Sequence, residues 1–457
     1  MSFEVINPAT GETVASYPAT APEEVELALA AAVAAQREWR AAGFEVRAAA
    51  LRRAAALLRE GREEHAHGMT QEMGKPLVEA RSEVDKCAWA CEHYAEHGEQ
   101  YLAPQAVETE AAGSYVAFEP LGLVLAIMPW NFPYWQVFRF AAPALMAGNG
   151  ALLKHAPNVP GCALAIEELL QTAGLPAGLF RTLLIDEDAT AGLIADSRVA
   201  AVTLTGSVRA GKAVAAKAGA ALKSTVLELG GSDAYVVLED ADLTQALDTC
   251  VKSRLINNGQ SCIAAKRFIV VEPLCEAFEQ GVVERMRAAR RGDPVDESNQ
   301  LGPLARADLR DNLHRQVEAS VAAGARLLLG GEVPEGNGFF YPPTVLAGVR
   351  PGMPAYSEEL FGPVAAILPA ADEAEAVRIA NDTVFGLGAA VFTGDAAKGE
   401  RIAREGLAAG CCFVNDFVRS DPRLPFGGVK ESGYGRELGV FGIREFVNVK
   451  TVWVAAS

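Results

Sequence analysis

The sequence predicts an α/β fold made of two units, each built on a parallel sheet. Three observations predict it. Helical patterns fill the first hundred residues, short apolar runs ending in Gly, Pro or Ser begin after Gly122, and a second set of such runs begins at Tyr235. Most of these runs lead into a helical pattern, which is typical of strands joined by crossover helices. The length of 457 residues suits two or three structural units.

The individual elements follow from their periodicity. Apolar residues three and four apart predict helices over residues 23–40, 45–68 and 76–100. The runs that predict strands are LGLVLAIMP, GALLKHAP, AAVTLTGS and KSTVLELGG in the first unit, and AYVVLED, KRFIVVE, ARLLLGG, VAAILPA and GAAVFTG in the second. Residues 114–122 and 448–457 alternate like strands, and the pattern leaves open whether they pair with another subunit or with an internal sheet edge.

Composition excludes several classes of protein. The chain has 41 Lys and Arg against 58 Asp and Glu, a net charge of −17, so its field repels a phosphate backbone and we expect no nucleic-acid partner. The most apolar stretch, Leu121 to Met128, is too short for a membrane span, and the first residues do not resemble a signal peptide. We therefore expect a cytoplasmic protein whose eight cysteines are reduced thiols.

One cluster has the composition of a metal site. Cys87, Cys91, His93 and His97 lie in a predicted helix, where each residue advances by about 100°. The two cysteines share one face and the two histidines share another, so one metal ion cannot reach all four. We predict buried thiols, surface imidazoles and no metal site.

Three segments carry residues suited to chemistry. Asn131 follows an apolar run in MPWNFP and presents an amide where α/β proteins bind ligands, unless it only caps a turn. Glu228 lies in an apolar run before two glycines, where a carboxylate has a raised pKa and suits a general base, unless it forms a structural salt bridge. Cys262 follows what reads as a flexible polar turn, NNGQS, and is a candidate nucleophile, although most single cysteines are inert.

The order PWNFP, ELGG, GQSC resembles the aldehyde dehydrogenase superfamily. The likeness runs from INPATGE through EMGKPLVEA, LTGSVRAG and EELFGPV to PFGGVKESGYGRE, which is nearly the whole chain. It implies that Cys262 is the nucleophile, that Asn131 and the Cys262 amide form the oxyanion hole, and that Glu228 activates the water that releases the acid. Because the CoA-acylating branch replaces this Glu, its presence favours hydrolysis.

The resemblance also implies an NAD or NADP site. The positions that match the family's cofactor-binding residues are Lys154, Gly206, Ser207, Glu359, Phe361 and Trp130. The turn at Gly206 would hold the pyrophosphate at a helix N-terminus. Pro157 stands where relatives have an acidic residue or Ser beside the ribose, so both nucleotides remain open.

The resemblance implies that the substrate is succinic semialdehyde, which is oxidised to succinate. Arg139 and Ser420 match residues that bind the carboxylate in succinate-semialdehyde dehydrogenases, and the chain resembles the shorter bacterial branch of these enzymes. Ile256 replaces a second Arg of the family, with Arg254 nearby as a weaker candidate. The alternative substrates are glutaric semialdehyde and general aliphatic aldehydes. The enzyme could instead form an acyl-CoA product, or the chain could be a non-catalytic protein that kept the fold. Arg139 could instead form a structural ion pair.

The resemblance further implies a domain organisation. Residues 1–101 and 121–230 form a Rossmann-like cofactor domain, and residues 231–440 form an α/β catalytic domain. Residues 102–120 and 441–457 form a β oligomerisation arm, which implies a homodimer or homotetramer.

Overall fold

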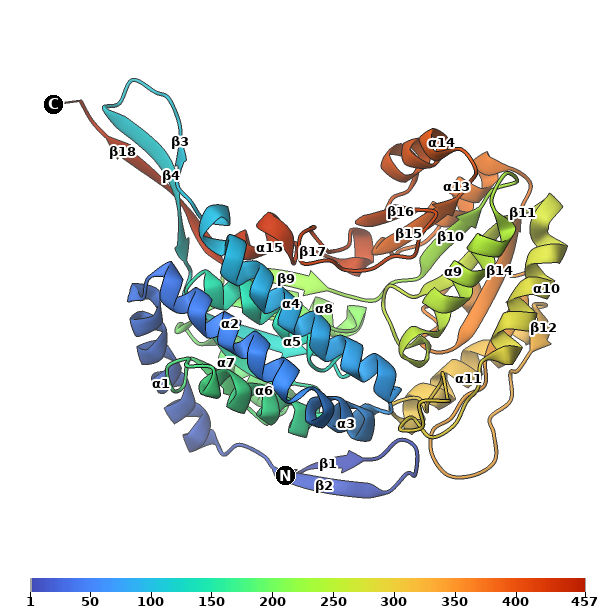
Figure 1. The fold of residues 1–457 in the computed structure, drawn as a ribbon, viewed down its shortest axis with the longest axis horizontal. Helices are drawn as coiled ribbons and strands as arrows, with labels where there is room; N and C mark the ends of the chain where they lie inside the picture. Colours follow the sequence, from blue (N-terminus) through green and yellow to red (C-terminus); the bar gives the residue numbers. More distant parts are fainter. Residues whose placement is uncertain (1, 457) are drawn as a thin grey trace.

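A computed structural model describes residues 2–456 and confirms the predicted α/β class (Figure 1). Its first large sheet has six strands in the order β17-β9-β8-β5-β6-β7, and only β17 is antiparallel to its neighbour. These strands are β5 (Leu123–Met128), β6 (Gly150–His155), β7 (Phe180–Thr182), β8 (Val199–Thr205), β9 (Ser224–Glu228) and β17 (Gly433–Tyr434).

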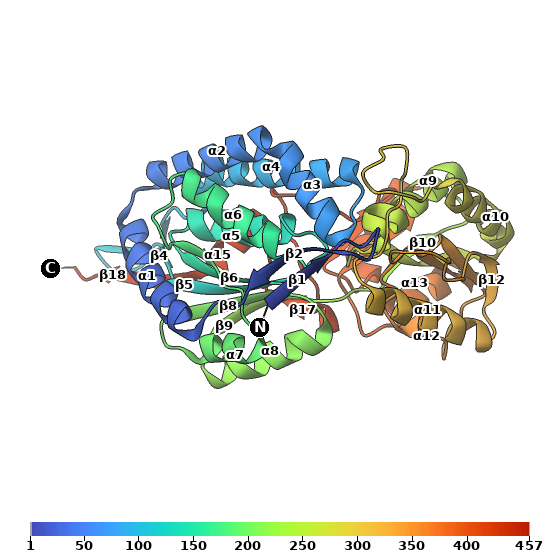
Figure 2. The ribbon, with the colours of Figure 1, turned by 90° about the horizontal axis from the view of Figure 1, so that it is seen from below.

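Helices cover both faces of this sheet, as Figure 2 shows for α5 and α6 on one side and α7 and α8 on the other. The helices of this unit are α1 (Pro22–Ala41), α2 (Phe44–Glu60), α3 (Arg62–Met73), α4 (Leu77–Tyr101), α5 (Trp135–Met146), α6 (Pro160–Thr172), α7 (Glu187–Ala195), α8 (Val208–Ala220) and α15 (Gly439–Arg444). The single helix expected over 45–68 is two helices, because Gly61 leaves helical geometry with ψ 14° and ends α2.

The second large sheet has seven strands in the order β12-β13-β14-β11-β10-β15-β16. Its strands are β10 (Asp233–Val237), β11 (Ala265–Val271), β12 (Arg326–Leu329), β13 (Thr344–Ala347), β14 (Val364–Ala370), β15 (Gly388–Phe392) and β16 (Cys411–Val414). One face packs against α9 (Leu243–Leu255) and α10 (Glu272–Ala288). The other packs against α11 (Ala307–Ala322), α12 (Pro354–Ser357) and α13 (Glu373–Asn381), and α14 (Ala396–Arg401) lies beside β16.

There are two further small sheets, of which the one containing the C-terminal strand projects from the body (Figure 1). An N-terminal hairpin joins β1 (Ser2–Ile6) to β2 (Thr13–Pro18). In the other small sheet, β4 (Gly113–Pro120) pairs antiparallel with β18 (Val447–Val454) along its full length and with the short β3 (Gln105–Ala106). The two segments whose alternation predicted strands therefore pair with each other.

The chain passes from the first large sheet to the second between Glu228 and Asp233. It returns once, because Gly433 and Tyr434 of β17 pair with β9 although they lie within the range predicted for the catalytic domain. No helix in residues 2–456 combines the length and apolar character needed to cross a bilayer.

Candidate active site

The candidate site lies at the point of the first large sheet where the strand order reverses. β5 is hydrogen-bonded to β6 on one side and to β8 on the other, so the connections leave it in opposite directions. In such sheets, ligands bind outside the carboxyl ends of the strands at this switch point. The loops that follow β5 and β8 contain Trp130, Asn131, Gly206 and Ser207, and all four line one pocket of about 330 Å³.

This switch-point pocket also receives residues from the second unit. Cys262, Glu359 and Phe361 line it together with the four residues above. A second pocket of about 150 Å³, here called the α5 pocket, is lined by Trp135, Gln136 and Arg139 of α5, by Ser420, and again by Cys262. The thiol therefore lies on the wall shared by two pockets, and Asn131 lies with it in the first.

The segment before Cys262 is held rigidly, which corrects the expectation of a flexible turn. Asn257 and Asn258, in the 3-10 turn η1 (Ile256–Gly259), are buried and adopt left-handed backbone with φ 56° and 58°. The Asn258 amide donates to the carbonyls of Gly74 and Pro303 at 2.9 and 2.8 Å. The polar side chains that predicted a loop here donate hydrogen bonds to buried backbone carbonyls.

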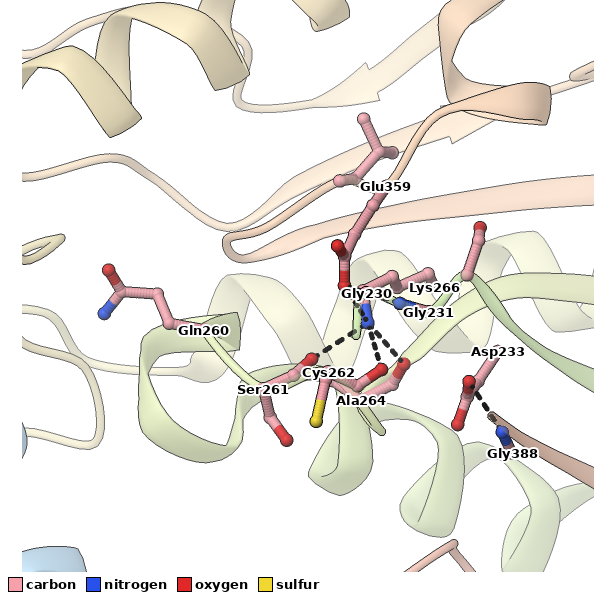
Figure 3. Close-up of polar contacts among 12 residues, drawn as sticks. Gly230, Gly231, Asp233, Gln260, Ser261, Cys262, Ala264, Lys266, Glu359 and Gly388 are labelled. Carbon is pink, nitrogen blue, oxygen red and sulfur yellow. Dashed lines mark hydrogen bonds and ion pairs between the residues drawn. The ribbon is translucent and has the colours of Figure 1, made fainter. Parts of the chain in front are cut away.

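Lys266 holds the backbone of the Cys262 segment in place (Figure 3). Its buried ammonium donates to the carbonyls of Ser261 and Cys262 at 2.9 and 2.7 Å and lies 3.3 Å from the Glu359 carboxylate. Glu359 in turn accepts from the Gly231 amide at 3.1 Å. The Cys262 sulfur points away from this network (Figure 3), so Lys266 positions the backbone and leaves the thiol free. Sequence reasoning missed Lys266, whose only signal was its place four residues after the cysteine.

Burial raises the pKa of the Cys262 thiol to about 12, although the charges of Arg139 and Lys266 oppose this. Desolvation disfavours the thiolate more than the two cations favour it. The site alone therefore holds a neutral thiol, and the nucleophile has to be deprotonated during the reaction.

Asn131 lines the same pocket as Cys262, and hydrogen bonds hold it in place. Its side-chain amide donates to the Gln260 carbonyl at 3.1 Å, and its own main-chain carbonyl accepts from the Asn257 amide at 2.7 Å. A carboxamide has two N–H groups, so one remains available to the pocket.

Glu228 ends β9 but does not line either pocket. Its buried side chain faces Gly427, where a Cβ would lie 2.7 Å from the carboxylate oxygen, and neither oxygen has a hydrogen-bond partner. Burial raises its pKa well above the usual range, and the charge of Arg139 only partly offsets this. The group is chemically suited to accept a proton but lies outside the two pockets that Cys262 lines.

The candidate cofactor residues fall into two places. Ser207 caps α8 by accepting from the Ala210 amide at 3.2 Å, so Gly206 and Ser207 lie where a helix N-terminus favours a phosphate. Trp130 packs edge-on against Phe361 with ring centres 5.8 Å apart. Lys154, on β6, does not line the switch-point pocket, and burial lowers its pKa.

The candidate substrate residues lie in the α5 pocket. Arg139 is buried and forms an ion pair with Glu437, while one guanidinium nitrogen donates to Thr205 at 3.3 Å. Ser420 accepts from Lys86 at 2.8 Å. Ile256 lines the pocket, whereas Arg254 does not, because its guanidinium donates to the backbone carbonyls of Leu360 and Gly259.

The histidines of α4 differ from the expectation of surface imidazoles. His93 is buried, with its ring centre 4.7 Å from that of His97 and its Nε2 bonded to the Tyr101 hydroxyl at 3.3 Å. Arg423, in the segment after β16, packs over the Trp89 ring of the same helix at 5.4 Å, a contact that a helical wheel does not reveal. In residues 2–456 no group of three or more His, Cys, Asp or Glu side chains is arranged to hold a metal ion.

Comparisons with known proteins identify the family of the chain. The model of the aldehyde dehydrogenase family matches residues 1–452. The chain is 52% identical over 448 residues to the NAD(P)+-dependent succinate semialdehyde dehydrogenase Sad of Escherichia coli K12, covering 98% of this chain and 97% of that one. It is 51% identical over 455 residues to a probable NADP+-dependent succinate-semialdehyde dehydrogenase of Synechocystis, covering both chains fully.

A solved structure has the same fold. The succinic semialdehyde dehydrogenase of Streptococcus pyogenes, in complex with NADP+, superposes with a TM-score of 0.97 at 38% identity, covering 99% of this chain and 100% of that one. With a family match over nearly all residues and relatives at half identity, the chain belongs to the aldehyde dehydrogenase family.

Proposed function

We propose that this protein oxidises succinic semialdehyde to succinate with NAD+ or NADP+. The observation that carries the proposal is the position of Cys262 on the wall shared by two pockets. One pocket contains a helix N-terminus suited to a phosphate, and the other contains cationic and hydroxyl groups suited to a carboxylate. The relatives named above share this activity by name.

In the reaction, the Cys262 thiol gives up its proton to the solvent, and the sulfur adds to the aldehyde carbon and forms a carbon–sulfur bond. The oxyanion that develops is stabilised by the Asn131 amide and by the main-chain N–H of Cys262. When bound, the oxidised nicotinamide supplies a hydride acceptor. The thioester left on Cys262 reacts with one water, the carbon–sulfur bond breaks, and the acid and the thiol are released.

Glu228 takes the proton from that water. Its side chain has to turn toward Cys262, and the lack of hydrogen bonds to its two oxygens leaves it free to do so. Its raised pKa makes it a stronger base than an exposed carboxylate.

The switch-point pocket suits the cofactor. The first turn of α8, which begins after Ser207, presents backbone N–H groups, whereas the Gly206 amide already donates to the Glu228 carbonyl at 2.9 Å. Glu359 and Phe361 line the same pocket as Cys262 and suit the nicotinamide ribose. Trp130 and Lys154 complete the set carried over from the family. Exposed Pro157 offers no side-chain polar group to the adenosine ribose, so we expect both nucleotides to be used.

Arg139 and Ser420 are proposed to bind the far end of the substrate, because both line the α5 pocket with Cys262. Glutaric semialdehyde is the nearest alternative, since it carries the same two functional groups.

The test compares kcat/KM for succinic semialdehyde and for butanal, each with NAD+ and with NADP+. The aldehydes have the same carbon chain length and differ in the carboxylate. We expect a preference of about 100-fold or more for succinic semialdehyde, which is about 2.7 kcal/mol. Equal values would indicate a general aldehyde dehydrogenase, and a product formed only with CoA would indicate an acyl transferase.

We also propose the domain division and an oligomeric state. As in the family, the cofactor domain comprises residues 1–101 and 121–230, the catalytic domain comprises residues 231–440, and the arm comprises residues 102–120 and 441–457. The arm exposes Val449, Trp453 and Val454 at 61, 50 and 52%, an apolar surface that a second copy would cover. Light scattering of the native protein and of Trp453→Asp tests this, since only the variant should dissociate.

A further inference from the structure

The α5 pocket contains a cation that the sequence did not reveal. Lys86 projects from α4 into this pocket, where its Nζ lies 2.8 Å from the Ser420 hydroxyl and 4.3 Å from the centre of the Trp135 ring. Trp135 also donates from Nε1 to the same hydroxyl at 3.2 Å. Helix α4, helix α5 and the loop after β16 thus meet at Ser420.

The hydrogen bonds at Ser420 orient its proton. A hydroxyl has two lone pairs and one proton, and here Lys86 and Trp135 both donate to the oxygen. With its lone pairs used, the Ser420 hydroxyl has its proton free to donate. Lys86 uses one of its three N–H groups on Ser420. The cluster can therefore offer several donors and no acceptor, which suits a carboxylate.

Three cations line the pocket, Lys86, Arg139 and Arg419, and they differ in how their charge is balanced. Arg419 pairs with Asp416 at 2.7 Å. Arg139 forms an ion pair with Glu437, and its field also acts on Glu228. Within residues 2–456, Lys86 has no carboxylate oxygen within 4.0 Å. The charged or titratable groups that act on it are Glu83, Cys87, Arg139 and Asp421.

The two carboxylates in that set are occupied by other cations. Glu83 pairs with buried Lys75 and accepts from the amides of Tyr134 and Trp135. Asp421 accepts two hydrogen bonds from Arg423 at 2.9 and 2.7 Å. Lys86 is thus the positive charge of the α5 pocket that no neighbour neutralises by contact.

We propose that Lys86 binds the carboxylate of the substrate, together with the Ser420 hydroxyl, and so determines the preference for a carboxylated aldehyde. This rests on the proposed function and assigns Lys86 as a specificity-determining residue. Arg139 lines the same pocket, but its charge is shared with Glu437, so its replacement also disturbs the carboxylates behind the site. Lys86 can be removed without touching that pair.

The experiment measures the ratio of kcat/KM for succinic semialdehyde to that for butanal. In Lys86→Met we expect this ratio to fall by about 30-fold or more, through KM for the semialdehyde, as befits a charged hydrogen bond. Lys86→Arg keeps the charge and should restore most of the ratio. Exposed Lys217 at the end of α8 is the matched control, and Lys217→Met should leave the ratio at the native value.

A second measurement covers the case in which Lys86→Met does not fold. Inhibition by the product succinate, measured in Ser420→Ala and in the native enzyme, should weaken about 10-fold or more in the variant. A native enzyme without preference for succinic semialdehyde would overturn the proposed function. A native preference that survives in Lys86→Met within threefold, or equal losses for both aldehydes, would overturn only the role of Lys86.

Discussion

Replacing Asn131 with Ala separates a catalytic donor from a structural one, because its two effects differ greatly in size. The change removes one hydrogen bond, from the side-chain amide to the Gln260 carbonyl at 3.1 Å. That carbonyl keeps a second donor, the Asn257 amide at 3.0 Å, so no buried acceptor is left without a partner. The main-chain carbonyl of residue 131 also keeps its bond to Asn257. We expect a stability loss of only about 1 kcal/mol.

The effect on the reaction is larger. A preorganised donor to a developing oxyanion contributes about 2.7–4 kcal/mol to transition-state stabilisation, so kcat should fall about 100- to 1,000-fold. Steady-state kinetics with succinic semialdehyde and NADP+, and thermal unfolding of the same preparations, measure the two effects. Asn337→Ala, in an exposed loop, is the control and should change neither.

Two results would refute the reasoning. If kcat of Asn131→Ala stayed within threefold of the native value, Asn131 would not be an oxyanion donor. If stability fell by several kcal/mol together with kcat, the residue would be a structural support of the cysteine segment, and the loss of activity would say nothing about the transition state.

Three further predictions follow from the same geometry. Glu228→Gln should keep a burst of NADPH in stopped-flow absorbance but lose at least about 100-fold in steady-state turnover, because a general base is missing after the first half-reaction; loss of the burst would contradict this role. Lys266→Met should lower the free energy of unfolding in urea by about 3 kcal/mol, as expected when one partner of a buried ion pair is removed, and an unchanged midpoint would contradict its anchoring role. Burial and the charge of Arg139 lower the pKa of Lys86 to about 8, so the ammonium is charged below that pH and loses its charge above it. KM for succinic semialdehyde relative to butanal should therefore rise between pH 7 and pH 9.5 in the native enzyme and stay constant in Lys86→Arg, and a flat native profile would refute it.

The parts of the fold that the sequence predicted are those with a long, uniform pattern. The apolar runs around Leu125, Leu152 and Ile269 are all strands of the two large sheets. The short strands β7 and β16, of three and four residues, were not predicted, whereas β12, also of four residues, was recognised from the apolar run ARLLLGG. Their pairing is decided by neighbours far along the chain.

The sequence predicted part of the candidate site. Asn131 and Cys262 stand out in their motifs, and the structure brings them into one pocket. The segment between Asn257 and Ser261 was misjudged, because Asn and Gln favour loops by composition while here they bond to buried carbonyls. Side chains whose partners are backbone groups of distant residues leave no trace in local composition.

Charge compensation is the property that sequence spacing cannot show. Arg139 was singled out because it matches a carboxylate-binding residue of related enzymes, yet its charge is balanced by Glu437, which lies near the end of the chain. Lys86 looks like one more charged residue on a long helix, and its partner Ser420 is 334 residues away. A cation selects an anionic substrate only by the charge that its neighbours leave uncompensated, because a neutralised pair adds little net attraction. We therefore predict that replacing Lys86 lowers the preference for succinic semialdehyde more than replacing Arg139 does. The ratio of kcat/KM for succinic semialdehyde to that for butanal, measured in a variant of each residue, decides between them.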